Sequence, residues 1–140
     1  MVPTFQTGQY LIVDELTYHL ESPQRGDVIV FKYPLDPSQY FIKRIIGLPG
    51  DTIDVNGGIV KINGAVLNEP YIAQAPLYNG EWTVPDGALF VLGDNRNDSR
   101  DSHQWGLLPM DHIIGKSEVI YWPPSDWQVI NHTEETFASQ

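Results

Sequence analysis

Short runs of apolar and β-branched residues alternate with turn residues along most of this chain. Strands are predicted at 10–13, 28–31, 40–46, 52–55, 59–62, 88–92 and 113–122, with a shorter one near 81–84. Most runs end at Gly, Pro, Asn or Asp, which is the usual punctuation of β structure. The uninterrupted apolar runs 28–31 and 88–92 indicate strands buried on both faces. The pattern predicts a mainly β fold of coiled antiparallel sheets, barrel-like, with few or no helices.

Two Asn-Gly steps, Asn56-Gly57 and Asn63-Gly64, adjoin β-branched runs and predict tight hairpins. Both central positions of a type I′ turn need positive φ, which Asn and Gly tolerate. Residues 68–87 are rich in Pro, Gly and Asn and are expected to form a surface excursion. We predict a single domain over residues 1–130 and a flexible tail over 131–140.

The strand at 40–46 carries a lysine on an apolar face. Side chains alternate along a strand, so Lys43 shares its face with Phe41 and Ile45, while Arg44 points away. One interpretation is an edge-strand lysine whose stem packs on the sheet and whose ammonium reaches water. The other is a desolvated lysine whose pKa falls from about 10.4 toward neutrality, so that it serves as a general base.

Composition narrows the class of protein. The 140 residues fit one domain, and the 12 Gly and 11 Pro favour a turn-rich β fold over a helical bundle. The net charge is −10 and no basic cluster occurs, so nucleic acid is not an expected partner. There is no cysteine, and the spacing of the four histidines does not match that of metal ligands: His19, His103, His112 and His132. We therefore expect neither a metal ion nor a cofactor. No apolar run approaches the roughly 18 residues of a membrane span, and the chain is expected to be soluble.

A polar stretch over residues 93–106 directly follows the predicted buried strand 88–92. Its Asp, Asn and Ser side chains can satisfy the backbone of their own loop, which is a purely structural interpretation. The functional interpretation is a loop that fixes a catalytic side chain in place. The residues alone leave both open.

Several motifs occur in a fixed order along the chain: Pro3-Thr4-Phe5, Arg25-Gly26-Asp27-Val28, Lys43-Arg44 followed by Gly47-Leu48-Pro49-Gly50-Asp51, and Gly93-Asp94-Asn95-Arg96 followed by Asp98-Ser99 and Asp101-Ser102. Together they resemble the boxes of type I signal peptidase, a membrane-anchored serine protease with a Ser/Lys dyad. The resemblance covers roughly residues 1–122. It implies an endopeptidase that removes N-terminal signal peptides from secreted proteins after an Ala-X-Ala-type motif, without a cofactor.

The resemblance also implies roles for single residues. Lys43 matches the general base, Ser99 the serine that orients this lysine, and Asp101 a supporting aspartate. The signal peptide would bind as an extended strand, against residues matching the substrate groove: Met1, Pro3, Phe41 and Ile42. The remaining matches are structural residues: Arg44, Asp94, Arg96 and Ser102.

The chain departs from the family pattern at two places. The nucleophilic serine of the family stands immediately before the residue that matches Met1, so the chain is expected to be inactive as it stands. The resemblance implies that the other oxyanion-hole groups and the membrane anchor are also expected upstream of Met1. After Asp101-Ser102, where many bacterial members carry arginine, this chain has His103, which puts an Asp–Arg ion pair there in doubt.

Partners and location follow from the resemblance. The expected partners are signal peptides of preproteins and a membrane surface. The parent enzyme is expected to be membrane-anchored, with its catalytic domain on the trans side of the membrane (periplasm, cell exterior or thylakoid lumen). Trp122 and Trp127 flank a Pro-Pro turn and either pack in the core or contact the membrane interface. The alternative function is a non-catalytic β module that binds peptides without cutting them.

Overall fold

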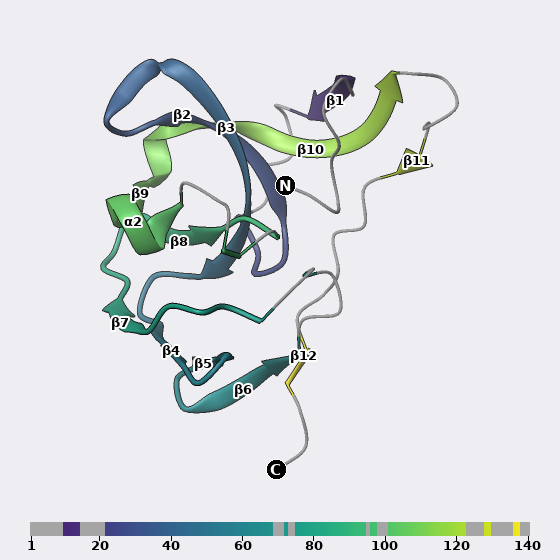
Figure 1. The fold of residues 1–140 in the computed structure, drawn as a ribbon. Coiled ribbons are helices and arrows are strands. Elements are labelled where there is room, and N and C mark those ends of the chain that lie inside the picture. The colour runs from purple at the N-terminus through teal and green to yellow at the C-terminus, as the bar shows by residue number, and fades with distance from the viewer. Residues whose placement is uncertain are drawn as a thin grey trace.

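The computed structural model describes residues 10–14, 22–68, 72, 75–94, 96–97, 101–122, 128–129 and 136–137. Two antiparallel sheets contain the strands of these residues (Figure 1). The first has the order β1-β10-β2-β3-β8-β9 with β11 paired to β10, and the second has the order β12-β6-β5-β4-β7. The predicted mainly β fold of antiparallel sheets is confirmed.

Strand bounds agree with the sequence pattern over most of the described chain. The first sheet comprises β1 (Tyr10–Asp14), β2 (Val28–Tyr33), β3 (Asp36–Gly47), β8 (Ala88–Leu92), β9 (Leu108–Pro109), β10 (Ile113–Trp122) and β11 (Gln128–Val129). The second comprises β4 (Thr52–Asn56), β5 (Ile59–Ile62), β6 (Ala65–Asn68), β7 (Gly80–Thr83) and β12 (Thr136–Phe137). In Figure 1 the strands β4, β5 and β6 gather beneath the first sheet.

The lysine strand β3 is 12 residues long and lies between β2 and β8. It begins earlier than predicted, because Tyr33 pairs with Asp36 and turns the expected connection into a hairpin. At its other end Gly47 allows close packing: a Cβ there would lie 2.5 Å from Ile53 Cδ1 and 3.0 Å from Phe90 Cβ. The strand therefore connects the two sheets through a position that only glycine fits without a shift of its neighbours.

The two predicted hairpins exist, but one turn is shifted. Ile62 pairs with Ala65, so Asn63 and Gly64 form a two-residue turn, with φ of 52° and 87° as a type I′ turn requires. Asn56 instead pairs with Ile59, so the turn consists of Gly57 and Gly58, with φ of 60° and 80°. The second glycine explains the shift, because Gly adopts positive φ at less cost than Asn.

Other differences from the sequence pattern concern short elements. Strand β6 was not predicted, and β7 starts and ends one residue earlier than expected. The polar stretch 93–106 contains the helical turn α2 (Ser102–Trp105), and β9 and the turn η1 (Met110–His112) follow it. Within the predicted tail, Thr136 pairs with Asn68 and Phe137 with Leu67 of β6. No helix within the described ranges is long and apolar enough to cross a membrane.

Two hydrophobic clusters fill the interior, and β3 and β8 contribute to both. The first cluster joins the second sheet to Ile46, Phe90 and Leu92. The second lies on the opposite faces of the same strands and includes Ile45 and Val91. All five residues of β8 are buried, as its uninterrupted apolar run predicted. Apolar side chains thus pack on both faces of β3 and β8, and this packing fixes the position of the side chains that the two strands carry.

Candidate functional site

Lys43 stands on the apolar side of β3. It is 9% exposed, lies opposite Ile29 of β2, and has Phe41 and Ile45 as neighbours on its own face. Its Nζ lies 5.6 Å from the centroid of the Phe41 ring. The edge-strand interpretation is wrong, because β3 lies inside the sheet and the side chain is buried. Burial among apolar groups disfavours a charged ammonium, which is the environment that a lysine base requires.

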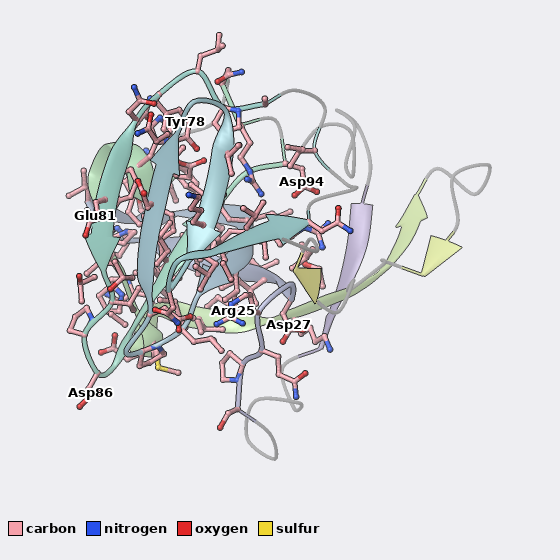
Figure 2. The ribbon with its side chains drawn as sticks, turned by 90° about the horizontal axis from the view of Figure 1, so that it is seen from below. Arg25, Asp27, Tyr78, Glu81, Asp86 and Asp94 are labelled. Atoms are coloured by element: carbon pink, nitrogen blue, oxygen red, sulfur yellow. The ribbon has the colours of Figure 1, made fainter. Side chains whose placement is uncertain are left out.

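Arg44, the next residue, is buried for a different reason. It is 1% exposed, and its Nε and Nη2 donate to Oδ1 and Oδ2 of Asp94, each at 2.9 Å. Its Nη1 donates to the Gly26 carbonyl at 3.0 Å. Two of the predicted structural residues thus form a bidentate ion pair that joins β3, the turn before β2 and the polar loop. Figure 2 shows Asp94 at the start of that loop.

The polar loop is fixed from within by two buried side chains. Arg96 is fully buried and its Nε donates to the Gly93 carbonyl at 2.9 Å. Asp101 is also fully buried, and its Oδ2 accepts a hydrogen bond of 2.9 Å from the Gly93 amide. Both backbone groups of Gly93 are therefore held by side chains of the loop: the carbonyl by Arg96 and the amide by Asp101.

The end of the loop is attached to β8 and to the helical turn. Ser102 is fully buried, and its Oγ accepts a 2.9 Å hydrogen bond from the Val91 amide. Asp101 caps α2, since its Oδ1 accepts from the His103 amide at 3.2 Å and also bonds the His103 ring at Nδ1. The partner of this aspartate is thus a histidine, where the family pattern suggested an arginine. The loop satisfies its own backbone and is also anchored to the strand beside β3.

Four of the predicted site residues lie outside the described residues: Ser99, Met1, Pro3 and Trp127. The contact between Lys43 and Ser99 therefore stays a prediction, as does the substrate groove. Trp122 is described only as the last backbone position of β10. Ile42 is half-buried on the other face of β3 from Lys43. In the described parts of the chain, no three His, Asp or Glu side chains gather as a metal site would require.

An aromatic cluster surrounds Phe41 and was not predicted. Phe41 stacks on Tyr33 with ring centroids 4.4 Å apart and meets Phe31 edge-on at 6.2 Å. Trp105 of α2 closes the cluster, at 5.9 Å from Phe31 and 5.8 Å from Tyr33. The register Phe31↔Phe41 brings these residues together, and a sequence does not show register. The cluster attaches α2 to the strand pair that carries the lysine.

A second network, also missed, fixes the far end of β3. Arg25 donates from Nη2 to Asp51 Oδ2 at 2.5 Å and from Nε to the Ile46 carbonyl at 3.1 Å. Asp51 also accepts from the Leu48 amide at 2.9 Å and from Asn63 Nδ2 at 3.0 Å. Burial raises the pKa of Asp51, but these hydrogen bonds and the Arg25 charge outweigh it and hold the pKa below its ordinary value.

The turn that supplies Arg25 is itself rigid. Asp27 is 6% exposed; its Oδ2 accepts from the Gln24 amide at 3.0 Å, and its Oδ1 lies 3.6 Å from Lys116 Nζ on β10. Gly26 has a φ of 94°, which few other residues adopt. Figure 2 shows Arg25 and Asp27 together on this turn. The sequence identified these residues as a motif but not as an anchor of β3.

Comparisons with known proteins agree with this geometry. Residues 1–122 match the family model described as signal peptidase, peptidase S26. A probable signal peptidase I-1 of Synechocystis is 48% identical over 135 residues, which cover 91% of this chain and 69% of that protein. A probable thylakoidal processing peptidase 2 of Arabidopsis thaliana is 39% identical over 143 residues, covering 96% of this chain and 39% of that protein.

A solved structure shares the fold as well as the sequence. The crystal structure of a signal peptidase I from Enterococcus faecalis superposes with a TM-score of 0.64 and 34% identity, covering 69% of this chain and 97% of that one. The chain spans 69%, 64% and 59% of the length of three bacterial relatives. The resemblance inferred from the motifs is confirmed: the chain belongs to the signal peptidase family, peptidase S26.

Proposed function

We propose that this chain is the catalytic part of a serine endopeptidase that removes N-terminal signal peptides from translocated proteins after an Ala-X-Ala-type motif. The observation that carries the proposal is the burial of Lys43 on the apolar face of an interior strand, in a chain of this family. Removing an ammonium from water favours its neutral form. A neutral lysine amine can take the proton of a serine hydroxyl, which is a weak nucleophile without an adjacent base.

Ser99 orients the Lys43 amine in this proposal, and Asp101 supports the loop that carries Ser99. Two anchors on either side of Ser99 support this role. Arg96 and Asp101, the buried residues that precede and follow it in the described chain, both bind Gly93. Fixed residues on both sides of Ser99 in the sequence are what orientation of a base by this serine requires.

The nucleophile in this proposal is the serine that, in the family, precedes the position matching Met1. The substrate lies as an extended strand along Met1, Pro3, Phe41 and Ile42, with small side chains selected by shallow pockets. The parent enzyme is membrane-anchored with its catalytic domain on the trans side, and Trp122 and Trp127 contact the membrane surface. Relatives named as bacterial signal peptidases and as thylakoidal processing peptidases support this location.

The decisive experiment compares two proteins on an Ala-X-Ala peptide in detergent: this chain, and the same chain extended upstream by the serine box of the family. We expect cleavage only by the extended form. Lys43→Ala should abolish it, whereas Lys61→Ala, a change at an exposed lysine of β5, should leave it unchanged.

Two outcomes would contradict the proposal. Full activity of the extended Lys43→Ala variant would remove Lys43 from the role of base. A folded extended protein that binds the peptide without cutting it would identify the chain as a peptide-binding module instead.

A further inference from the structure

A row of aromatic rings lies beside Lys43 on one face of β2 and β3. The register pairs Phe31 of β2 with Phe41, which stands two residues before Lys43 on the same face of β3. Tyr33 stands two residues beyond Phe31 on β2, toward the β2–β3 hairpin. Along the strands, the position of Phe41 therefore lies between Tyr33 on one side and Lys43 on the other.

The contacts between the rings restrain Phe41. It stacks on Tyr33 with centroids 4.4 Å apart and an interplanar angle of 15°, and it meets Phe31 edge-on at 6.2 Å. Both arrangements are geometries that aromatic pairs prefer. Phe41 is only half-buried, so the core does not enclose its ring on every side, and the stack on Tyr33 supplies part of the restraint.

Trp105 supports Tyr33 from a different element. Its indole meets the Tyr33 ring in a T-shaped contact, with centroids 5.8 Å apart and an interplanar angle of 68°. Trp105 is the last residue of α2, and the first residue of this turn, Ser102, is anchored to the Val91 amide of β8. Tyr33 therefore joins α2 to β3 through ring contacts.

The Phe41 ring in turn restrains the end of the Lys43 side chain. The lysine Nζ lies over this ring, 5.6 Å from its centroid. The face of an aromatic ring is electron-rich and attracts the N–H bonds of an amine as well as those of an ammonium, so this contact does not require a particular charge on the lysine. A contact near the end of a long, flexible side chain reduces the number of positions that its Nζ adopts.

We propose that Tyr33 is a positioning residue: by stacking on Phe41 it holds the ring over which the Lys43 amine lies, and Trp105 supports it in this role. A catalytic base must stay within hydrogen-bond reach of the hydroxyl whose proton it takes, and a small displacement lowers the rate strongly. The inference rests on the proposed function, because the position of this amine matters for catalysis only if Lys43 is the base.

The test uses the serine-extended chain with Tyr33→Leu, with Tyr33→Phe as the conservative variant and with Trp82→Leu as the matched control. Trp82 of β7 packs against Phe90 with ring centroids 4.8 Å apart, in the first hydrophobic cluster and not on the face of Lys43. With the amount of folded protein taken from urea unfolding, Tyr33→Leu should lower kcat on the Ala-X-Ala peptide about tenfold, because Phe41 and the amine lose their restraint. Tyr33→Phe keeps the ring and should keep the parent kcat. Trp82→Leu also loses an aromatic pair and should keep it too.

Trp105→Leu is a second variant on the same row of rings. It should also lower kcat, by less than Tyr33→Leu, because it acts on Phe41 through Tyr33. Equal kcat values for Tyr33→Leu and Trp82→Leu would overturn the proposal. A Tyr33→Phe variant as slow as Tyr33→Leu would do the same, since the ring alone would then not be what matters.

A spectroscopic readout needs neither the serine nor activity. In this chain, the ring current of Phe41 should shift the NMR signal of the Lys43 Hε protons upfield, and Lys43→Met identifies that signal by its loss. The signal should move toward the ordinary lysine position in Tyr33→Leu and stay in place in Tyr33→Phe and Trp82→Leu. One unchanged position in the parent and these three variants would contradict the inference.

The two proposals fail separately. Activity that survives Lys43→Ala contradicts the proposed function, and the NMR signal still reports whether Tyr33 positions the lysine. Activity that requires Lys43 but is as high in Tyr33→Leu as in Trp82→Leu contradicts only the role of Tyr33.

Discussion

Lys43 and Arg44 are adjacent basic residues on one strand, both buried, and their side chains lie on opposite faces of it. Arg44 meets a carboxylate in bidentate geometry and a carbonyl. Lys43 stands beside Ile45 and the Phe41 ring, on a face filled by apolar side chains. A buried cation that is paired keeps its charge and joins segments of the fold. Apolar surroundings disfavour the charged form of a lysine, and under the proposed function Lys43 is the residue that accepts a proton. The alternation of a strand is enough to separate these two roles by one residue.

The largest expected effect comes from replacing Lys43 by a neutral side chain of similar length. In the serine-extended chain, Lys43→Met should lower kcat by about a thousandfold or more, because the base is gone. The free energy of unfolding should change far less than the rate, since methionine keeps an apolar side chain of similar length in the buried position. Peptide cleavage measures kcat, and urea unfolding measures the free energy of unfolding. A strong loss of stability would mean that the lysine holds the fold, as Arg44 does.

The matching change on the other face should show the reverse. Arg44→Met leaves the Asp94 carboxylate buried without its partner and should cost about 3–5 kcal/mol of unfolding free energy. Adding Asp94→Leu removes this buried carboxylate and should recover much of the lost unfolding free energy. Urea unfolding of the single and double variants is the measurement. If both variants were equally destabilised, the hydrogen bond to Gly26 rather than the ion pair would be the main contribution of Arg44.

The anchor of the polar loop to β8 should have a smaller effect. Ser102→Ala removes the acceptor of the Val91 amide and leaves that buried N–H unsatisfied, at a cost of about 1–3 kcal/mol. Ser38→Ala in the exposed β2–β3 hairpin is a suitable control and should change stability by less than about 0.5 kcal/mol. Equal effects of the two changes would show that the Ser102 anchor is replaced by solvent.

The sequence predicted the face of each side chain on β3 but not its partners across the fold. Strand periodicity placed Lys43 with Phe41 and Ile45, and the structure agrees. The Arg44–Asp94 pair joins residues fifty positions apart, and it was reached only through a motif that named both as structural. The contact of Tyr78 with His103 had no signal, because it depends on the path of an irregular excursion. Local patterns fix periodicity and turns, while register and loop paths follow from the packing of the whole chain.

Asp51 lies between β3 and the first strand of the second sheet, β4, and replacing it should have the smallest effect on stability. Burial alone would raise its pKa, but the Leu48 amide, Arg25 and Asn63 lower it below the ordinary value of 3.8. A carboxyl whose pKa is lower in the folded chain stabilises the fold above the unfolded pKa, and this contribution disappears as pH falls through the folded pKa. Because Asp51 is partly exposed, solvent screens the effect, and Asp51→Asn should cost roughly 1 kcal/mol at pH 7. Once the pH has fallen below the folded pKa, so that the parent carboxyl is also protonated, the two proteins should unfold at more similar urea concentrations. A stability difference that stays constant from pH 7 down through that range would show that Asp51 acts through its hydrogen-bond geometry alone and not through its charge.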